Sequence, residues 1–153
     1  MSSPRTLVLF NYDWDQLGFA RWAPEFPSDC AGFDLFSFPS NAHLVNFDLE
    51  RFVEQLAKKA GPAGWQAVTS NHEQFGALAA ALLAEKMGWP GTPVNAVLAC
   101  QHKFHARQVL EQVAPEANTP CSLLASRYGE AVPEDIVYPV FVKPVKAAFS
   151  VLA

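Results

Sequence analysis

The sequence predicts an α/β fold in which a small parallel sheet is followed by a partial α+β unit. Leu7–Phe10 is a short uninterrupted apolar run, as expected for a parallel strand buried on both faces. Strand and helix patterns then alternate as far as Met87. After the Pro- and Gly-rich turn at 89–93, helices are followed by two further strand candidates. The change of pattern predicts two domains, at 1–95 and 96–153.

The first part is expected to hold three strands. The first is Leu7–Phe10, and the second is predicted at Phe33–Phe38, where a strand-like run ends at Pro39. The third is predicted at Trp65–Thr69. Residues 13–32 contain two prolines, so at most a short helix and then a loop are expected there.

Two helices are expected between and after these strands. The clearest has apolar residues at helical spacing on one face, namely Leu49, Phe52, Val53, Leu56, Ala57 and Ala60. Asp48 suits its start and Gly61 its end. The next runs from Ser70 to about Met87, because Ser70–Glu73 has the form of a capping box in which Ser70 accepts from the Glu73 amide.

The second part is expected to contain helices first and strands after them. Val94–Cys100 predicts a short helix and Phe104–Val113 a longer one. Strands are predicted at Cys121–Ala125 and Val137–Val145, with a polar loop between them.

Composition and charge exclude several classes of partner. Half of the 153 residues are apolar, 17% are charged, and the net charge is −4, so neither nucleic acid nor an anionic membrane is expected as a partner. No apolar run approaches the roughly 20 residues that span a bilayer, and Met1–Arg5 shows no signal-peptide pattern. The three cysteines are far apart and are predicted to be buried thiols of a reducing compartment. Cytoplasm is therefore the expected location.

The common nucleotide-binding and hydrolase motifs are absent from the sequence. Asn11–Gln16, which follows the first strand, contains no glycine for a tight pyrophosphate turn. Neither a P-loop nor a Gly-x-Ser-x-Gly elbow occurs. These absences disfavour a dinucleotide-binding turn, a P-loop NTPase and an α/β-hydrolase.

A few polar residues are candidates for ligand contacts. Asn11 and Asp13 follow the first strand, and ligands of α/β proteins bind at the carboxyl ends of strands. A substrate contact is one interpretation, and loop capping is the other. His102 and His105 lie three residues apart without a third ligand in helical register, so surface histidines are favoured over a metal site.

Two stretches of the second part carry a resemblance to a known family. Gly88–Pro93 reads Gly-Trp-Pro-Gly-Thr-Pro and precedes the short helix and Gln101–Leu110, in which Lys103 is followed by Arg107. Tyr138–Val145 reads Tyr-Pro-Val-Phe-Val-Lys-Pro-Val. Together they resemble the ATP-grasp superfamily, which has a G-x-P-G turn, a short helix, a lysine with an arginine four residues later, and a P-x-hydrophobic-hydrophobic-K-P strand.

The resemblance is strongest over residues 66–150, where Thr119-Pro120 stands in the place of a P-T-P turn, and is weaker over 6–60. It implies that 1–95 is a small Rossmann-like, parallel-sheet pre-ATP-grasp domain. It also implies that 96–153 is the incomplete N-terminal part of an α+β ATP-grasp subdomain.

ATP and Mg²⁺ are the cofactors that the resemblance implies. By it Lys103 and Lys143 are ATP contacts, and Ser150 is a further candidate for the phosphates. The Mg²⁺ ligands of such proteins lie in a C-terminal part that this sequence does not hold, and magnesium sites combine carboxylates with substrate phosphates. The chain is therefore expected to be a fragment that does not turn over by itself.

The residues also support a role for Lys143 without the family. It lies in an apolar strand candidate, where an ammonium is costly to bury unless an anion pairs with it. The alternative is an edge-strand lysine that points to solvent. For Lys103 the alternative is a solvated helix face, because Lys103, Arg107 and Glu111 form a charged stripe.

Two departures from the family pattern affect this site. His102 stands where Asp or Asn is usual. Residues 145–150 contain no glycine, although the family has a flexible Gly/Ser-rich loop there.

The implied function is that of the N-terminal portion of an ATP-dependent ligase, which joins a small carboxylate to an amine or thiol through an acyl-phosphate. The sequence leaves open whether the intact protein is catalytic. One alternative is a non-catalytic module that binds a small molecule or a protein and keeps a vestigial ATP site. Another is a metabolite-sensing Rossmann-like domain without ligase descent, in which Lys143 is exposed and far from Lys103. A homodimer is compatible with each.

Overall fold

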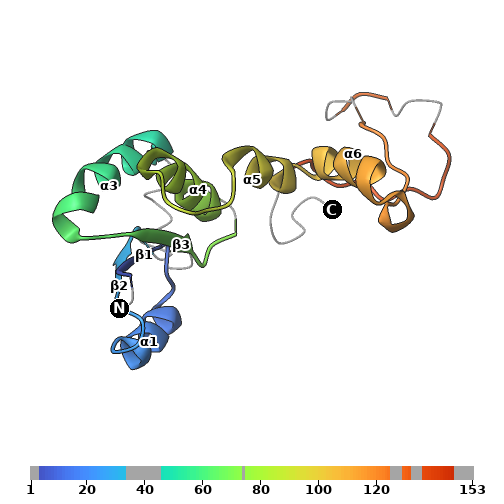
Figure 1. Ribbon diagram of the computed structural model, residues 1–153. Helices are drawn as coiled ribbons and strands as arrows, with labels where there is room; N and C mark the ends of the chain where they lie inside the picture. Colours follow the sequence, from blue (N-terminus) through green and yellow to red (C-terminus); the bar gives the residue numbers. More distant parts are fainter. Residues whose placement is uncertain (1–3, 34–45, 74, 125–128, 132–135, 147–153) are drawn as a thin grey trace. The chain divides into compact units, whose positions relative to one another are not determined.

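The computed structural model describes residues 4–33, 46–73, 75–124, 129–131 and 136–146 (Figure 1). By its internal contacts the chain divides into two units, Met1–Val97 and Leu98–Ala153. The identification of 1–95 and 96–153 as a pre-ATP-grasp domain and the start of an ATP-grasp domain stays a prediction.

The first unit is built on a parallel sheet of three strands in the order β2-β1-β3. These strands are β1 (Thr6–Leu9), β2 (Ser28–Ala31) and β3 (Ala67–Ser70). Leu9 pairs with Ala31 on one side and with Ser70 on the other. Every residue of β1 is buried, which explains its continuous apolar sequence. The predicted α/β class with a small parallel sheet is confirmed.

The second strand lies earlier in the chain than the sequence predicted. Ser28–Ala31, expected to be loop, forms β2 along the whole length of β1. Residues 34–38 of the predicted strand lie outside the described residues. The polar β2 sequence gives little sign of a strand, but as an edge strand β2 is only partly buried and therefore tolerates Ser28 and Asp29.

A single carboxylate ties the amino ends of the three strands together. Arg5 donates two hydrogen bonds to Asp29, from Nε to Oδ2 over 2.7 Å and from Nη2 to Oδ1 over 2.8 Å. Trp65 Nε1 donates to the same Oδ2 over 2.6 Å. These donors, Arg5 first, hold the pKa of Asp29 below its usual range. Since Arg5 precedes β1 and Trp65 precedes β3, the network joins all three strands.

Helices α3 (Leu49–Ala63) and α4 (Phe75–Met87) cover one face of the sheet, and α1 (Asp13–Trp22) lies on the other side (Figure 1). This is the arrangement that right-handed crossovers to opposite sides of β1 produce. The core is a cluster of buried residues from β1, the residue after it, α3 and α4, namely Leu7, Leu9, Phe10, Val53, Leu56, Ala79 and Leu83. In contrast, α1 has no buried residue.

The predicted start of α3 is confirmed, and its predicted end is wrong. The Asp48 side chain accepts from the Arg51 amide over 2.9 Å, as an N-cap does. The helix continues through Gly61 and ends at Gly64, which has φ of 72°. Its amide donates to the carbonyls of Ala60 and Gly61, so the left-handed residue closes the helix.

The start of α4 also differs from the prediction. Ser70 belongs to β3, and the helix begins only at Phe75. The Ser70 hydroxyl accepts from the His72 amide over 3.1 Å, within the turn that joins β3 to α4. The helix ends at Met87 before Gly88, whose φ is 67°, as predicted.

Helices α5 (Val94–Gln101), α6 (Lys103–Val113) and the 3₁₀ helix η1 (Pro115–Ala117) follow. Both α-helices were predicted. The two strands were not found, because residues 121–124 and 137–145 form no strand. A strand needs a neighbour for its backbone groups, and the described residues beyond Val97 contain none.

Two further predictions concern the burial of the three cysteines and the absence of a membrane-spanning segment. Cys30, Cys100 and Cys121 are free and exposed, so the prediction of buried thiols is wrong. In the described part of the chain, no helix has the length and apolar character that a membrane span requires.

Candidate functional site

The carboxyl ends of the neighbouring strands β1 and β3 lie at the topological switch point of the sheet, where β1 has β2 on one side and β3 on the other. Open α/β sheets bind ligands at such switch points. Asn11 follows β1 here, while Asn71 and His72 follow β3.

Asn11 is held firmly at this point. It is 4% exposed, and its Nδ2 donates to the carbonyl of Val8 over 3.0 Å. Its Oδ1 accepts from Asn71 Nδ2 over 3.4 Å. Ser70 completes the link between the strands, since its hydroxyl donates to the carbonyl of Leu9 over 3.1 Å. The two strand ends are thus joined by side chains as well as by the sheet.

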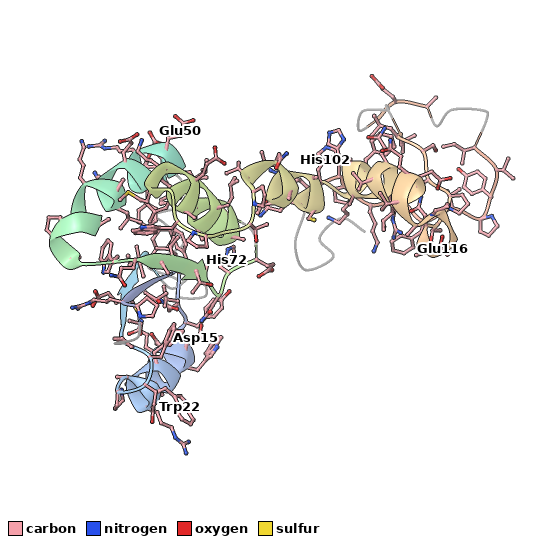
Figure 2. The ribbon with its side chains drawn as sticks, viewed as in Figure 1. Asp15, Trp22, Glu50, His72, His102 and Glu116 are labelled. Carbon is pink, nitrogen blue, oxygen red and sulfur yellow. The ribbon has the colours of Figure 1, made fainter. Side chains whose placement is uncertain are left out.

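The imidazole of His72 lies against the first turn of α4 (Figure 2). Its Nδ1 accepts from the Gly76 amide over 3.4 Å, which in a neutral ring places the proton on Nε2. Burial lowers the pKa of His72, and the nearby Glu73 opposes that effect. A neutral histidine with an Nε2 donor is therefore favoured at this site.

Gly76 allows α4 to approach the strand ends so closely. A Cβ at this position would lie 2.4 Å from Ser70 Oγ and 2.8 Å from His72 Cβ. Neither distance is compatible with a side chain. The sequence prediction missed Gly76, Asn71 and His72; the signal available was a glycine in the first turn of an otherwise Ala- and Leu-rich helix.

Phe10 stands between β1 and Asn11 in a strained conformation. Its φ is 56°, a region that non-glycine residues rarely adopt, and its side chain is fully buried. Four rings hold it there, those of Phe33, Phe47, Phe52 and Phe75. Such outliers persist where the surrounding structure imposes them, often next to ligand sites.

Asp13 lies apart from this cluster. It is the first residue of α1 and is exposed. The carboxylate that caps this helix is that of Asp15, which accepts from the Tyr12 amide over 3.0 Å. Asn11 and Asp13 were both predicted as substrate contacts. In the described part of the chain, only Asn11 is hydrogen-bonded to the segment that follows β3.

A backbone hydrogen bond links the two segments that contain Lys103 and Lys143, the predicted ATP contacts. The Lys103 amide donates to the carbonyl of Val145 over 3.0 Å, which links the start of α6 to the Lys-Pro segment. Lys143 is exposed, with Nζ 5.1 Å from the centroid of the Phe141 ring. The argument from burial of Lys143 is wrong, because the segment forms no strand and most of its apolar side chains are exposed.

His102, at the position where the ATP-grasp pattern has Asp or Asn, caps the amino end of α6. It is the N-cap of α6, and its Nδ1 accepts from the His105 amide over 3.3 Å. Its ring lies 4.4 Å from that of His105. In the parts of the chain that the structure describes, no three His, Cys, Asp or Glu side chains are grouped to hold a metal. Ser150, the third predicted phosphate contact, lies outside the described residues.

Among the comparisons with known proteins, the search of solved structures gives matches. No protein-family model matches the chain, and no curated protein does. The crystal structure of an L-amino acid ligase from Bacillus licheniformis, an ATP-grasp enzyme, matches with a TM-score of 0.63 at 20% identity. The match covers 96% of this chain and 38% of the ligase. The chain therefore shares the fold of part of this ligase, and the predicted resemblance is confirmed at the level of the fold alone.

Proposed function

We propose that this chain is the N-terminal portion of an ATP-dependent ligase that joins a small carboxylate to an amine or thiol through an acyl-phosphate. The observation that carries the proposal is the fold match to an L-amino acid ligase over nearly the whole chain. That relative suggests an amino acid as the carboxylate. An ATP-consuming reaction of this kind also suits the cytoplasm.

Lys103 and Lys143 are the proposed phosphate contacts. Their segments are joined by the bond from the Lys103 amide to the Val145 carbonyl. Because the Lys103 amide is already hydrogen-bonded to Val145, the phosphate contacts are expected from the side-chain ammonium groups of the two lysines. Their role would be to neutralise charge that develops on the phosphates, with Ser150 as a further donor. When bound, Mg²⁺ would supply further charge neutralisation, from ligands that we place outside the described residues.

The cluster at the carboxyl ends of β1 and β3 is the proposed contact for the small carboxylate. Asn11 Nδ2 carries a second hydrogen beside the one donated to Val8, and the Nε2 of a neutral His72 is a donor. Both suit a carboxylate oxygen. Asp13, at the exposed start of α1, stays a weaker candidate for the same substrate. In this scheme the chain supplies binding and charge, but neither a nucleophile nor a general base.

The alternative is a non-catalytic binding module with a vestigial ATP site. Residues 145–150 contain no glycine for a loop that closes over phosphates, and this observation favours it. In contrast, the metabolite-sensing alternative required Lys143 to be exposed, as it is, and also far from Lys103. The bond between Lys103 and Val145 speaks against the second requirement.

Binding of ATP to the chain, followed by NMR, tests the proposal. Two charge-assisted hydrogen bonds supply about 3–6 kcal/mol before ordering costs, so affinity of about millimolar or weaker is expected. ATP should shift the amide signals around Lys103 and Lys143. Lys143→Ala should abolish most of the shift, and Lys59→Ala, an exposed lysine of α3, should not.

A longer protein that contains this chain offers the sharper test. There we expect micromolar ATP binding and amino-acid-dependent release of ADP, both lost in Lys143→Ala. ATP binding without ADP release by any tested carboxylate and amine would favour the non-catalytic module. Absence of any ATP effect in both proteins would refute the phosphate site.

A further inference from the structure

A groove of about 540 Å³ lies along α1, and none of its lining residues belongs to the cluster of Asn11, Asn71 and His72. Aromatic side chains form most of its wall, namely Trp14, Phe19, Trp22 and Phe26. Trp14 and Trp22 are 59% and 57% exposed, and no residue of α1 is buried. The volume is in the range of small-molecule sites. The described contacts of α1 therefore do not explain why it displays two tryptophans.

The spacing along the helix forms the groove. Trp14, Gly18 and Trp22 recur every four residues and so share one face of α1. A Cβ at Gly18 would meet no atom within 4 Å, so packing does not demand this glycine. Glycine is a poor helix former, and here it leaves the space between the two indoles open.

Neighbouring contacts hold the aromatic walls in place. Trp14 stacks on Tyr12 with ring centroids 4.8 Å apart, and Phe19 stacks on Phe26 at 6.1 Å. The Phe26 amide donates to the carbonyl of Trp22 over 2.8 Å, so the chain beyond α1 turns back to the groove. The walls are preorganised without a ligand.

Both charged residues that line the groove are acidic. They are Asp15, whose carboxylate is fixed by the Tyr12 amide over 3.0 Å, and Glu25. Figure 2 labels Asp15 and Trp22 on α1. Aromatic faces attract cations, tryptophan most strongly, and desolvation strengthens that attraction. We propose that this groove binds a small organic ammonium ion, with the indoles as its walls and the two carboxylates as its counter-charge.

This proposal does not depend on the ligase reaction. The groove contains no basic side chain to hold phosphate or a carboxylate. A metal ion is a poor match as well, since no group of three potential metal ligands occurs among the described residues. An aliphatic or quaternary amine satisfies both the aromatic walls and the acidic groups.

NMR titration of the chain with tetramethylammonium tests the proposal. We expect saturable shifts of the indole N–H signals of Trp14 and Trp22, and none for Trp65 and Trp89. The uncharged tert-butanol should bind at least tenfold more weakly. The double variant Asp15→Asn, Glu25→Gln keeps the side-chain shapes and should also weaken binding at least tenfold.

A second pair of variants separates groove filling from loss of fold. Gly18→Leu should abolish binding while the helical circular dichroism is kept. Gly61→Leu, at an open glycine of α3, should bind as the wild type does.

Equal binding of tert-butanol, or unchanged affinity in the double variant, would overturn the ammonium proposal. Binding of lysine peptides without binding of tetramethylammonium would do so too, because the occupant would then be a protein.

Discussion

The side-chain amide of Asn71 donates to Oδ1 of Asn11 over 3.4 Å. The two residues follow neighbouring parallel strands and meet at the switch point of the sheet. Since Asn11 is buried and also bonded to Val8, its position is set before any ligand arrives. Preorganisation of this kind is what a substrate contact requires.

Gly76→Ala is expected to lower the free energy of unfolding by about 1–3 kcal/mol, because the new methyl group overlaps Ser70 and His72. An alanine inside a helix normally stabilises by about 0.5–1 kcal/mol relative to glycine. Gly61→Ala in α3, where a Cβ meets nothing within 4 Å, is the control and should show that gain. Urea denaturation measures both. A Gly76→Ala variant as stable as the wild type would contradict the close approach.

The pKa of His72 is expected to lie below the ordinary value of about 6.5, because burial disfavours the charged ring. In that case the unfolded chain binds the proton more readily than the folded one. The free energy of unfolding should then fall as the pH drops through the ordinary histidine range. NMR titration gives the pKa, with the resonances assigned by their loss in His72→Gln. A pKa at or above the ordinary value would refute the prediction.

Asp29→Asn should destabilise the protein most at neutral pH. The pKa of Asp29 is lowered in the fold, so its contribution is present above the unfolded pKa of about 3.9. It is lost as the pH falls through the lower, folded value. The difference in unfolding free energy between wild type and variant should therefore shrink in strong acid. In an Arg5→Met background the same substitution should cost less at neutral pH, and an equal cost would show that Arg5 is not the main partner.

His102→Ala should destabilise α6 by about 0.5–2 kcal/mol, since the N-cap to the His105 amide is lost. His102→Asp should keep or raise the stability, because carboxylate oxygens are better N-caps than imidazole. Hydrogen exchange of the α6 amides measures local stability directly. His105→Ala is the control, and exchange as fast in it as in His102→Ala would contradict a specific capping role.

The parts of the fold that local chemistry determines were predictable. The buried run of β1 and the amphipathic pattern of α3 required no knowledge of their neighbours. In contrast, β2 exists because β1 pairs with it, and its sequence Ser-Asp-Cys-Ala carries no strand signal of its own. The opposite error occurred at 137–145, where an apolar sequence has no neighbouring strand among the described residues.

The candidate site was predictable only in part for a similar reason. Asn11 was found because the carboxyl end of a strand is a general place for ligands. Asn71 and His72 depend on which strand lies beside β1, and the sequence does not state the strand order. Gly76 depends on how closely α4 approaches, which only the packing reveals.

The order of the strands has a consequence for the protein during its synthesis. The first strand made, β1, is the central one, and it is the most apolar segment of the sheet. Its partner β2 is translated soon afterwards, but β3 and the covering helices α3 and α4 follow much later. Until Ser70 leaves the ribosome, one side of Leu7–Leu9 has no backbone partner. The nascent chain is therefore expected to depend most on chaperones in this interval, when an apolar strand edge is open to aggregation.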